Sequence, residues 1–320
     1  MAIDRTRAEG QTVLVTGSQG FVGRHLRKRL VDRGARCLGV DLPGTGAEIE
    51  VDLADPSFDP NALWDRAGAV TSVIYMAANI TRTSSVDAKA RSNLRLIAEA
   101  PVRLMEAAHA RGLCSHVVDC STYKLYGPQK QPRIVAATHP RRPDPFSYGS
   151  AKALSERLLS ISARRSGYGY AMVHPTCIYG PGQHLHNAIP LFLEACLEGR
   201  APVVFGDGKS IRDDVFAPDL ADIMIEAALR HTTGSFNAHG ERAFTILEVA
   251  KLCCQAVGAT HLEPRLEDGK PPKWWLDQTF DQTATRDAFH FTPTPLLEGL
   301  RAEAEWIKAG APKETERFAP

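Results

Sequence analysis

The sequence predicts an α/β protein organised around a Rossmann-type, doubly wound parallel sheet. Two observations predict this fold class. Short β-branched runs alternate with amphipathic helical stretches along the first 180 residues, and a glycine-rich turn joins the first run to the first helix. Alternating strands and helices build a parallel sheet that is covered on both faces. Because the alternation loosens after Gly180, we expect one domain over residues 11–180 and a smaller, partly interleaved region over residues 181–320.

Each predicted element rests on a local pattern. The run TVLVTG (12–17) is expected to be a buried strand because it is short, β-branched and stopped by glycine. The helix that follows has Phe21, Leu26 and Leu30 on one side and ends at Gly34. By the same criteria, further strands are predicted at 36–42, 48–53, 72–79, 115–121 and 170–176. Helices are predicted at 86–111, with a break near Pro101, and at 147–166, 185–199, 218–230, 245–257 and 296–308.

The composition argues against several classes of protein. Apolar residues make up 43% and charged residues 23% of the chain, and the net charge of +1 provides no bulk attraction to nucleic acid or an anionic membrane. The polar start MAIDRTRAEG is unlike a signal peptide, and no apolar run approaches the ~18 residues of a membrane span. Seven scattered cysteines without a C-x-x-C motif indicate neither a disulfide framework nor a zinc module, and His184 and His186 lack an evident third metal ligand. We therefore expect a soluble cytoplasmic protein without a metal site.

The turn TGSQGFVG has the composition of a phosphate-binding loop. It supplies Gly17, Gly20 and Gly23, and glycines let backbone N–H groups approach a pyrophosphate at a helix N-terminus. The next strand ends at Asp41, about where dinucleotide-binding proteins carry an acid for the adenosine ribose. A carboxylate there accepts hydrogen bonds from the ribose hydroxyls and repels a 2′-phosphate, so NAD is favoured over NADP. The alternative is a structural turn with a solvated aspartate.

The G-x-x-G-x-x-G spacing, with the rest of the chain, resembles the extended short-chain dehydrogenase/reductase superfamily and, within it, the NAD-dependent epimerase/dehydratase family. The resemblance is UDP-glucose 4-epimerase-like and runs from about residue 11 to residue 308. It implies a Rossmann domain that binds NAD and a C-terminal region that binds substrate. The further residues that it implies as cofactor contacts are Gln19, Phe21, Val22, Leu42, Asp52, Leu53, Met76, Ala77, Ala78, Cys120, Pro175 and Thr176.

Tyr148 and Lys152 stand four positions apart in SYGSAK, on the helix predicted after the fifth strand. Residues i and i+4 share one face of a helix, so the ammonium can stabilise a phenolate and lower the tyrosine pKa from its usual value near ~10. The resemblance implies that this pair is catalytic and that Lys152 also holds the nicotinamide ribose. It further implies that Thr122 orients the substrate hydroxyl, with Ser121 as a weaker candidate beside it. Alone, such a pair is more often a solvated surface pair.

Two segments that face the substrate depart from the family pattern. Where the 4,6-dehydratases of the family carry Asp-Glu after the threonine, this chain has Tyr123 and Lys124, so elimination of water is not expected. In VHPTCIYGPGQ, His174 replaces an arginine, and Cys177 replaces an asparagine that contacts the substrate diphosphate in the family. The second replacement favours the alternative of a substrate without a nucleotide.

Arg212, in FGDGKSIRDDVFAPDLA, has two possible roles. The resemblance implies that it grips the phosphate of a nucleotide sugar. The alternative is a structural arginine paired with Asp213 or Asp214. The expected substrate contacts are Arg82, Thr122, Cys177 and Arg212.

Three functions are compatible with these features. The leading hypothesis is an NAD-dependent epimerase of a nucleotide-linked sugar, which transfers a hydride to NAD and takes it back through a keto intermediate. The alternative is an NAD-dependent dehydrogenase that oxidises a hydroxyl of a free sugar, sugar acid or other small molecule. A non-catalytic NAD-binding regulator is less favoured, because the chain keeps both Tyr148 and Lys152. The resemblance also implies a homodimer joined through four helices.

Overall fold

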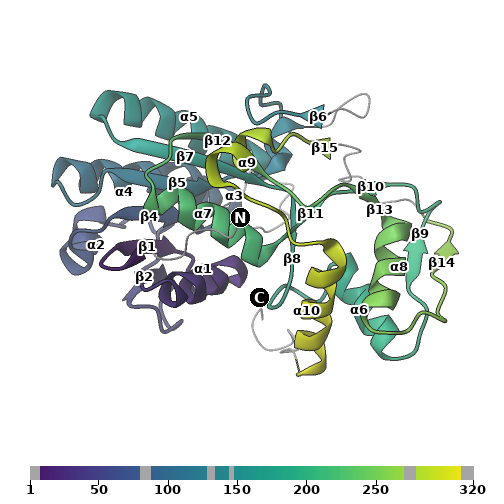
Figure 1. Ribbon diagram of the computed structural model, residues 1–320. Coiled ribbons are helices and arrows are strands. Elements are labelled where there is room, and N and C mark those ends of the chain that lie inside the picture. The colour runs from purple at the N-terminus through teal and green to yellow at the C-terminus, as the bar shows by residue number, and fades with distance from the viewer. Residues whose placement is uncertain (1–7, 80–87, 128–133, 144–147, 270–278, 311–320) are drawn as a thin grey trace.

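The computed structural model describes residues 8–79, 88–127, 134–143, 148–269 and 279–310. Its centre is a seven-stranded sheet in the order β12-β7-β5-β4-β1-β2-β3, in which all neighbouring strands are parallel (Figure 1). The strands are β1 (Thr12–Thr16), β2 (Arg36–Asp41), β3 (Ile49–Glu50), β4 (Ser72–Tyr75), β5 (His116–Cys120), β7 (Gly169–Pro175) and β12 (Gly234–Ala238). The strand order changes direction between β1 and β4, as in a Rossmann fold, so the predicted fold class is confirmed.

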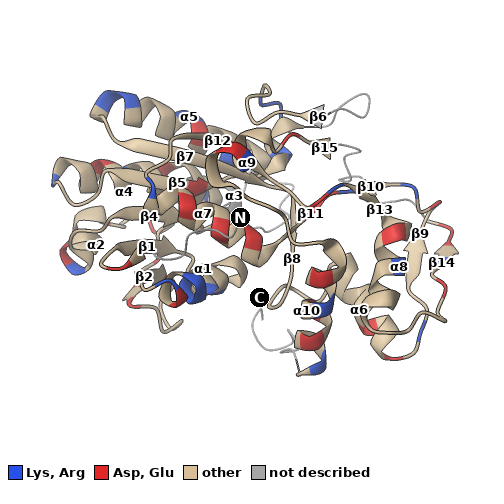
Figure 2. Cartoon of the chain, in the orientation of Figure 1, with Lys and Arg blue, Asp and Glu red and all other residues tan. Residues whose placement is uncertain are grey.

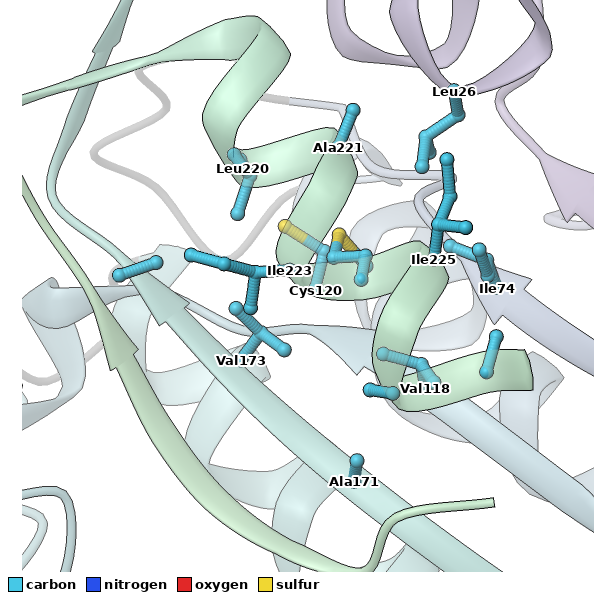
Figure 3. Close-up of a cluster of buried hydrophobic side chains, with 14 of the residues drawn as sticks. Leu26, Ile74, Val118, Cys120, Ala171, Val173, Leu220, Ala221, Ile223 and Ile225 are labelled. Carbon is cyan, nitrogen blue, oxygen red and sulfur yellow. The ribbon is translucent and has the colours of Figure 1, made fainter. Parts of the chain in front are cut away.

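Helices cover both faces of the sheet because successive side chains of a strand point to opposite faces. Val13 and Val15 of β1 enter one apolar cluster, whereas Leu14 between them enters another. Figure 3 shows part of the first cluster, with Ile223 next to Val173 of the sheet and Ile225 near Leu26 and Ile74. The helices over the first cluster are α1 (Phe21–Asp32) and α7 (Ala217–Leu229). The helices over the second are α2 (Pro60–Ala67), α4 (Ala100–Ala110) and α5 (Tyr148–Ser166).

Buried ion pairs join α1 to α7, although almost 200 residues separate them in the chain. The side chain of Arg33 is 4% exposed and donates to Asp222 at 2.5 Å and to Glu226 at 2.8 Å. Breaking a buried pair leaves one charge uncompensated, at a cost of about 3–5 kcal/mol. These pairs therefore hold α7 against the end of α1. Elsewhere, Figure 2 shows acidic and basic residues side by side on surface helices such as α10 (Leu296–Lys308).

The helix predicted over 86–111 is observed from Ala88 to Ala110, and a π-helical segment interrupts it near the predicted break. It consists of α3 (Ala88–Leu94), a π-helical segment over Arg95–Glu99 and α4, in which Pro101 lies in the first turn. Proline has no N–H to donate and clashes with a regular preceding turn, and the wider π turn accommodates it. Within the described ranges, no helix combines the length and the apolar character that crossing a membrane requires.

The chain after Gly180 contributes both to the sheet and to a smaller group of helices. β12 pairs with β7 as the seventh strand of the sheet. The sequence patterns did not predict it, because GSFNA is short and opens on a glycine. In the structure that glycine, Gly234, has φ +135°. A third apolar cluster lies between α6 (Ala188–Leu197), α8 (Ile246–Ala256) and α10, which Figure 1 shows grouped beyond one end of the sheet. The division of the chain at residue 180 stays a prediction.

Short strands and one further helix complete the described structure. Paired strands connect β8 (Cys177–Tyr179) to β11 (Asp214–Phe216), β9 (Val203–Phe205) to β14 (Arg265–Glu267), β10 (Ile211–Arg212) to β13 (Phe244–Thr245), and β6 (Ile134–Val135) to β15 (Thr279–Phe280). The further helix is α9 (Thr283–Phe289). None of these was predicted, because two- and three-residue strands carry no periodicity and α9 spans only two turns.

Candidate active site

The glycine turn wraps closely around the first residues of α1. Gly17 has φ +66°, a conformation that glycine adopts without strain. A Cβ atom at Gly23 would lie 2.1 Å from the carbonyl oxygen of Gly17, so only glycine fits there. Gly20 is the N-cap of α1 and supplies no side-chain cap, and the described part of the chain offers no acceptor to the N–H groups of residues 21–23. These N–H groups are suited to hold an anion such as a pyrophosphate.

Asp41 lies at the carboxyl end of β2, beside the glycine turn. Its Oδ2 accepts a hydrogen bond from the backbone N–H of Gln19 at 2.7 Å, and its Oδ1 accepts from the N–H of Leu42 at 2.8 Å. The two bonds fix the carboxylate and leave each oxygen a further lone pair. A glycine cradle with open N–H groups and a fixed acid beside it fit the pyrophosphate and the adenosine ribose of NAD.

The other predicted cofactor contacts follow the carboxyl ends of the strands. Thr16 Oγ1, at the end of β1, accepts hydrogen bonds from the N–H groups of Met76 at 3.0 Å and Ala77 at 3.1 Å, so the chain that leaves β4 is tied to β1. After β7, the N–H of Thr176 donates to the carbonyl of Ala238 at 3.0 Å. Residues at or just beyond the ends of β3, β4, β5 and β7 also include Asp52, Leu53, Ala78, Cys120 and Pro175. Open α/β sheets bind their ligands at this edge.

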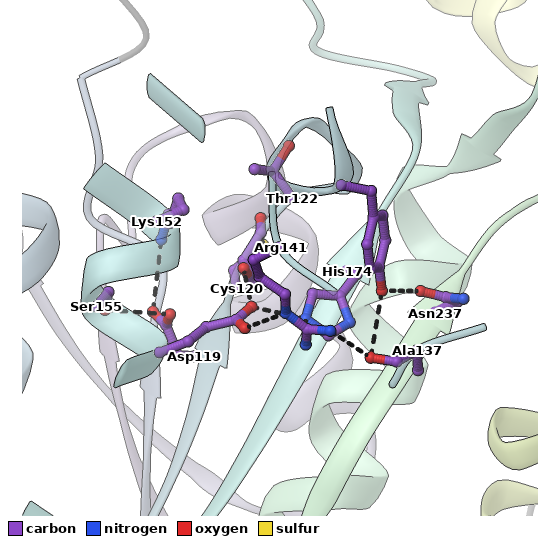
Figure 4. Close-up of polar contacts among 12 residues, drawn as sticks. Asp119, Cys120, Thr122, Ala137, Arg141, Lys152, Ser155, His174 and Asn237 are labelled. Atoms are coloured by element: carbon purple, nitrogen blue, oxygen red, sulfur yellow. Dashed lines mark hydrogen bonds and ion pairs between the residues drawn. The ribbon is translucent and has the colours of Figure 1, made fainter. Parts of the chain in front are cut away.

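Tyr148 is the first residue of α5, and Lys152 lies one turn later on the same helix. Tyr148 is half-buried, and burial raises its pKa to about 12, against the lowering effect of the Lys152 ammonium. Lys152 is 1% exposed, and its Nζ lies 3.4 Å from Oδ1 of Asp119 in β5 (Figure 4). Burial disfavours the ammonium, but Asp119 and Tyr148 outweigh burial and raise the pKa of Lys152. The phenol therefore lies one helical turn from a buried lysine whose ammonium form is favoured by Asp119.

Thr122 and Ser121 follow β5 directly, and their hydroxyls have different partners. Thr122 caps a 3₁₀ turn, η3 (Tyr123–Tyr126), and its Oγ1 accepts from the N–H of Lys124 at 3.4 Å. As an acceptor in that bond, the Thr122 hydroxyl keeps its hydrogen for another oxygen. Ser121 instead donates to Oε1 of Glu156 at 2.5 Å. Thr122 is thus available to a substrate oxygen, whereas the hydroxyl hydrogen of Ser121 is used inside the protein.

Sequence reasoning did not identify three charged residues near this site, namely Asp119, Arg141 and Glu156. Asp119 is fully buried and Glu156 is 8% exposed, and Figure 4 shows Asp119 and Arg141 within the polar network. A signal existed for two of them. Asp119 interrupts the apolar run HVVDC, and Glu156 follows Lys152 at the spacing of one helical turn. Because buried charges require partners, both positions indicate a polar network.

Arg212, on β10, forms a bidentate ion pair with Asp214. Its Nε lies 2.8 Å from Oδ2 and its Nη2 lies 2.5 Å from Oδ1, and the two side chains are 10% and 3% exposed. Of the two pairings considered from the sequence, the observed one is therefore with Asp214. Asp214 stands opposite Cys177 in the β8–β11 ladder, and Cys177 Sγ lies 3.5 Å from the Tyr123 hydroxyl. Cys177 therefore lies beside the Arg212–Asp214 ion pair.

Arg82, the remaining predicted substrate contact, lies outside the described residues.

The chain is similar to known proteins over nearly its whole length. The profile of the NAD dependent epimerase/dehydratase family matches residues 13–238. The UDP-glucose 4-epimerase of Mycolicibacterium smegmatis is 28% identical over 92% of this chain and 98% of its own. The dTDP-4-dehydro-6-deoxy-D-allose reductase of Streptomyces bikiniensis is 27% identical over 94% of this chain and 98% of its own.

Two solved structures combine this similarity with bound cofactor. MoeE5 in complex with UDP-glucose and NAD has a TM-score of 0.76 at 28% identity and covers 93% of this chain and 99% of its own. The complex of Thermus thermophilus UDP-glucose 4-epimerase with NAD has a TM-score of 0.78 at 25% identity, with the same two coverages.

Proposed function

Because the chain belongs to the NAD-dependent epimerase/dehydratase family and is an NAD-dependent enzyme of the extended short-chain dehydrogenase/reductase type, we propose that it epimerises a nucleotide-linked sugar. The observation that supports this most is the contact between η3 and the first turn of α5. A Cβ atom at Gly149 would lie 3.0 Å from the carbonyl oxygen of Lys124, so the turn that begins at Thr122 touches the turn that begins at Tyr148. A threonine hydroxyl and a phenol can then serve one substrate oxygen.

In this proposal each of the three side chains has one task. Tyr148 takes the proton of the sugar hydroxyl as a general base, and Thr122 hydrogen-bonds the same oxygen and orients it. Lys152 keeps its charge beside the phenol and favours the phenolate, while Asp119 holds its ammonium at 3.4 Å. NAD, when bound, supplies the acceptor and later donor of the hydride, together with a positive charge near Tyr148. That charge matters because a pKa of about 12 is too high for a base at neutral pH.

Cofactor retention tests the epimerase proposal. The purified protein is denatured and its supernatant is assayed for NAD, and the intact protein is incubated with UDP-glucose and with UDP-glucuronic acid. An epimerase must take its hydride back, so we expect stoichiometric NAD and formation of the 4-epimer without net NADH. Protein that is purified without cofactor and accumulates NADH from either sugar would contradict the proposal.

The Arg212–Asp214 pair favours a second candidate, an NAD-dependent dehydrogenase of a free sugar or sugar acid. A guanidinium that is already neutralised by a carboxylate attracts a diphosphate less than a free one does, because the ligand meets the like charge of Asp214. Cys177, the neighbour of Asp214 across the ladder, also lacks the amide that family members present there. With added NAD and a panel of free sugars and sugar acids, this candidate predicts NADH in proportion to substrate consumed. Turnover confined to nucleotide sugars would exclude it.

We also propose a homodimer formed through α5 and the adjacent helices. Leu154 and Ile161 stand seven residues apart on one face of α5 and are each 42% exposed, and Leu94 at the end of α3 is 40% exposed. Changing Leu154 and Ile161 together to glutamate should convert a dimer into a monomer of the 34.9 kDa chain, measured by light scattering. Leu191→Glu on α6, 49% exposed, is the matched control and should leave the mass unchanged. A parent protein that is already monomeric would refute the proposal.

A further inference from the structure

The buried carboxylate of Glu156 links four segments of the chain near the candidate catalytic residues: α5, the end of β5, β7 and the segment that carries Arg141. Glu156 lies on α5, two turns after Tyr148. Its Oε1 accepts hydrogen bonds from Ser121 Oγ at 2.5 Å and from His174 Nε2 at 2.7 Å, and its Oε2 accepts from Arg141 Nε at 2.9 Å. Burial alone would raise the pKa of Glu156, but His174, Arg141 and Ser121 together lower it to about 2. The carboxylate therefore stays charged and fully engaged.

Arg141 is the most exposed member of this group, and its guanidinium has several partners. Its Nη1 donates to the carbonyl oxygens of Ala137 at 2.8 Å and His139 at 2.6 Å, and its guanidinium carbon lies 5.3 Å from the centre of the Tyr126 ring. Its side chain is 22% exposed. An ordinary surface ion pair leaves a long side chain mobile and contributes little. Here the planar guanidinium binds four groups at once, which a lysine could not do.

The proton on His174 follows from the two contacts of its Nε2. The contact with Glu156 is 2.7 Å and that with Arg141 Nη2 is 3.3 Å, and a guanidinium and a carboxylate cannot both be served by one nitrogen. The shorter contact assigns the hydrogen to Nε2 as a donor to Glu156. Among the described residues, the other ring nitrogen, Nδ1, is buried and has no hydrogen-bond partner. Arg141 contributes a guanidinium 2.9 Å from the other oxygen, Oε2, and so places a positive charge directly beside Glu156.

The segment that carries Arg141 leads toward Tyr148 and rests on the turn of Thr122. The N–H of Arg142 donates to the carbonyl of Leu125 in η3 at 2.8 Å. A Cβ atom at Gly127 would lie 1.8 Å from the carbonyl oxygen of Arg142, so the backbones of these two residues are in contact. Glu156, as a residue of α5, thus links that helix to Arg141 and to Ser121. Ser121 directly precedes Thr122.

We propose that Arg141 is a positioning residue for hydride transfer: through Glu156 and Ser121 it fixes Thr122 relative to Tyr148. This inference rests on the proposed roles of Tyr148 and Thr122. It does not require that the substrate carry a nucleotide. None of the contacts among Arg141, Glu156 and Ser121 involves Cys177, the position where a nucleotide diphosphate would be expected.

Arg141→Met tests the inference, with Arg142→Met as the matched control, because Arg142 is the exposed neighbour on the same segment. For the sugar that the native enzyme turns over, we expect kcat to fall by about 10- to 100-fold in Arg141→Met, since small misplacements of reacting groups have effects of this size. KM and the NAD content should change by less than about threefold, because the substrate and cofactor contacts are untouched. Arg141→Lys should recover part of kcat, as it keeps a charge for Glu156, and Arg142→Met should match the parent.

A second measurement does not depend on knowing the substrate. Hydrogen–deuterium exchange of peptides that cover residues 120–127 and 148–156 should be faster in Arg141→Met by about tenfold or more, and unchanged in Arg142→Met. The inference would be overturned if Arg141→Met showed the same exchange rates and the same kcat as the parent protein. A general loss of melting temperature and of NAD, with no fall in kcat for the folded fraction, would also overturn it. If Tyr148→Phe keeps full activity, the proposed function fails instead, and the exchange experiment still decides whether Arg141 orders both segments.

Discussion

Replacing Tyr148 by phenylalanine is expected to lower kcat by about 10²- to 10⁴-fold, the range that general acid–base catalysis contributes. The change removes one oxygen from a half-buried side chain and leaves α5 and its packing in place. We therefore expect the melting temperature and the amount of bound NAD to stay close to those of the parent protein. Turnover of UDP-glucose, or of whichever sugar proves active, measured alongside thermal unfolding and cofactor content, checks both parts.

The pH profile distinguishes the loss of a base from a general disturbance. The active form of the base is the phenolate, and burial raises the pKa of Tyr148 to about 12 in the protein alone, from which the charge of bound NAD lowers it. The rate of the parent protein should therefore rise as pH increases and more phenolate forms, and this rise should be absent in Tyr148→Phe. Tyr170→Phe, near the amino end of β7, is the matched control and should retain both the rate and its pH dependence. Full activity in Tyr148→Phe would disprove the catalytic role.

Replacing Gly23 by alanine is expected to have the largest effect on cofactor binding and stability together. The added Cβ would lie 2.1 Å from the Gly17 carbonyl oxygen and 2.8 Å from backbone atoms of Ser18. No flexible side chain can move aside, so α1 or the glycine turn must shift. Overpacking of this kind costs about 1–3 kcal/mol of unfolding free energy, and a shifted turn no longer aims its N–H groups at a pyrophosphate. Urea unfolding and NAD content measure the two consequences.

Gly20→Ala, in the same turn, is the control for this prediction. Gly20 has an extended backbone, with φ −69° and ψ 177°, and a Cβ there would lie 3.2 Å from its closest neighbour, the carbonyl oxygen of Gly17. We expect its unfolding free energy to stay within about 1 kcal/mol of the parent, because no conformational strain and only a tight contact are introduced. Equal stability and equal NAD content in Gly23→Ala and the parent would show that the turn is looser than its geometry indicates.

Much of the fold was predictable because it depends on short segments. The alternation of Val13, Leu14 and Val15 between two apolar clusters follows from the period of a β-strand, and the sequence shows that pattern directly. The six strands of the central sheet that precede Gly180 and the long helices were predictable for the same reason. β12 was not, because its five residues open on a glycine and its pairing with β7 is a contact between distant parts of the chain.

The candidate site divides in the same way. The glycine spacing, Asp41 and the four-residue step from Tyr148 to Lys152 are local patterns, and the family resemblance that they carry implied their chemistry. The partners of these residues are not local. Lys152 meets Asp119 across 33 positions and Ser121 meets Glu156 across 35, so only the packing of α5 against β5 brings them together.

Arg212 shows that an ion pair between residues close in sequence could be assigned only from the fold. Asp213 and Asp214 were equal candidates as its partner, one and two positions away. In the structure the Asp213 carboxylate accepts a hydrogen bond from the N–H of Gly240 at 3.1 Å, while Asp214 pairs with Cys177 across the ladder and turns its carboxylate to Arg212. Residue types and their spacing indicated the reaction chemistry, and the tertiary packing determined which charges remain available to a substrate, because burial requires each charge to have a partner.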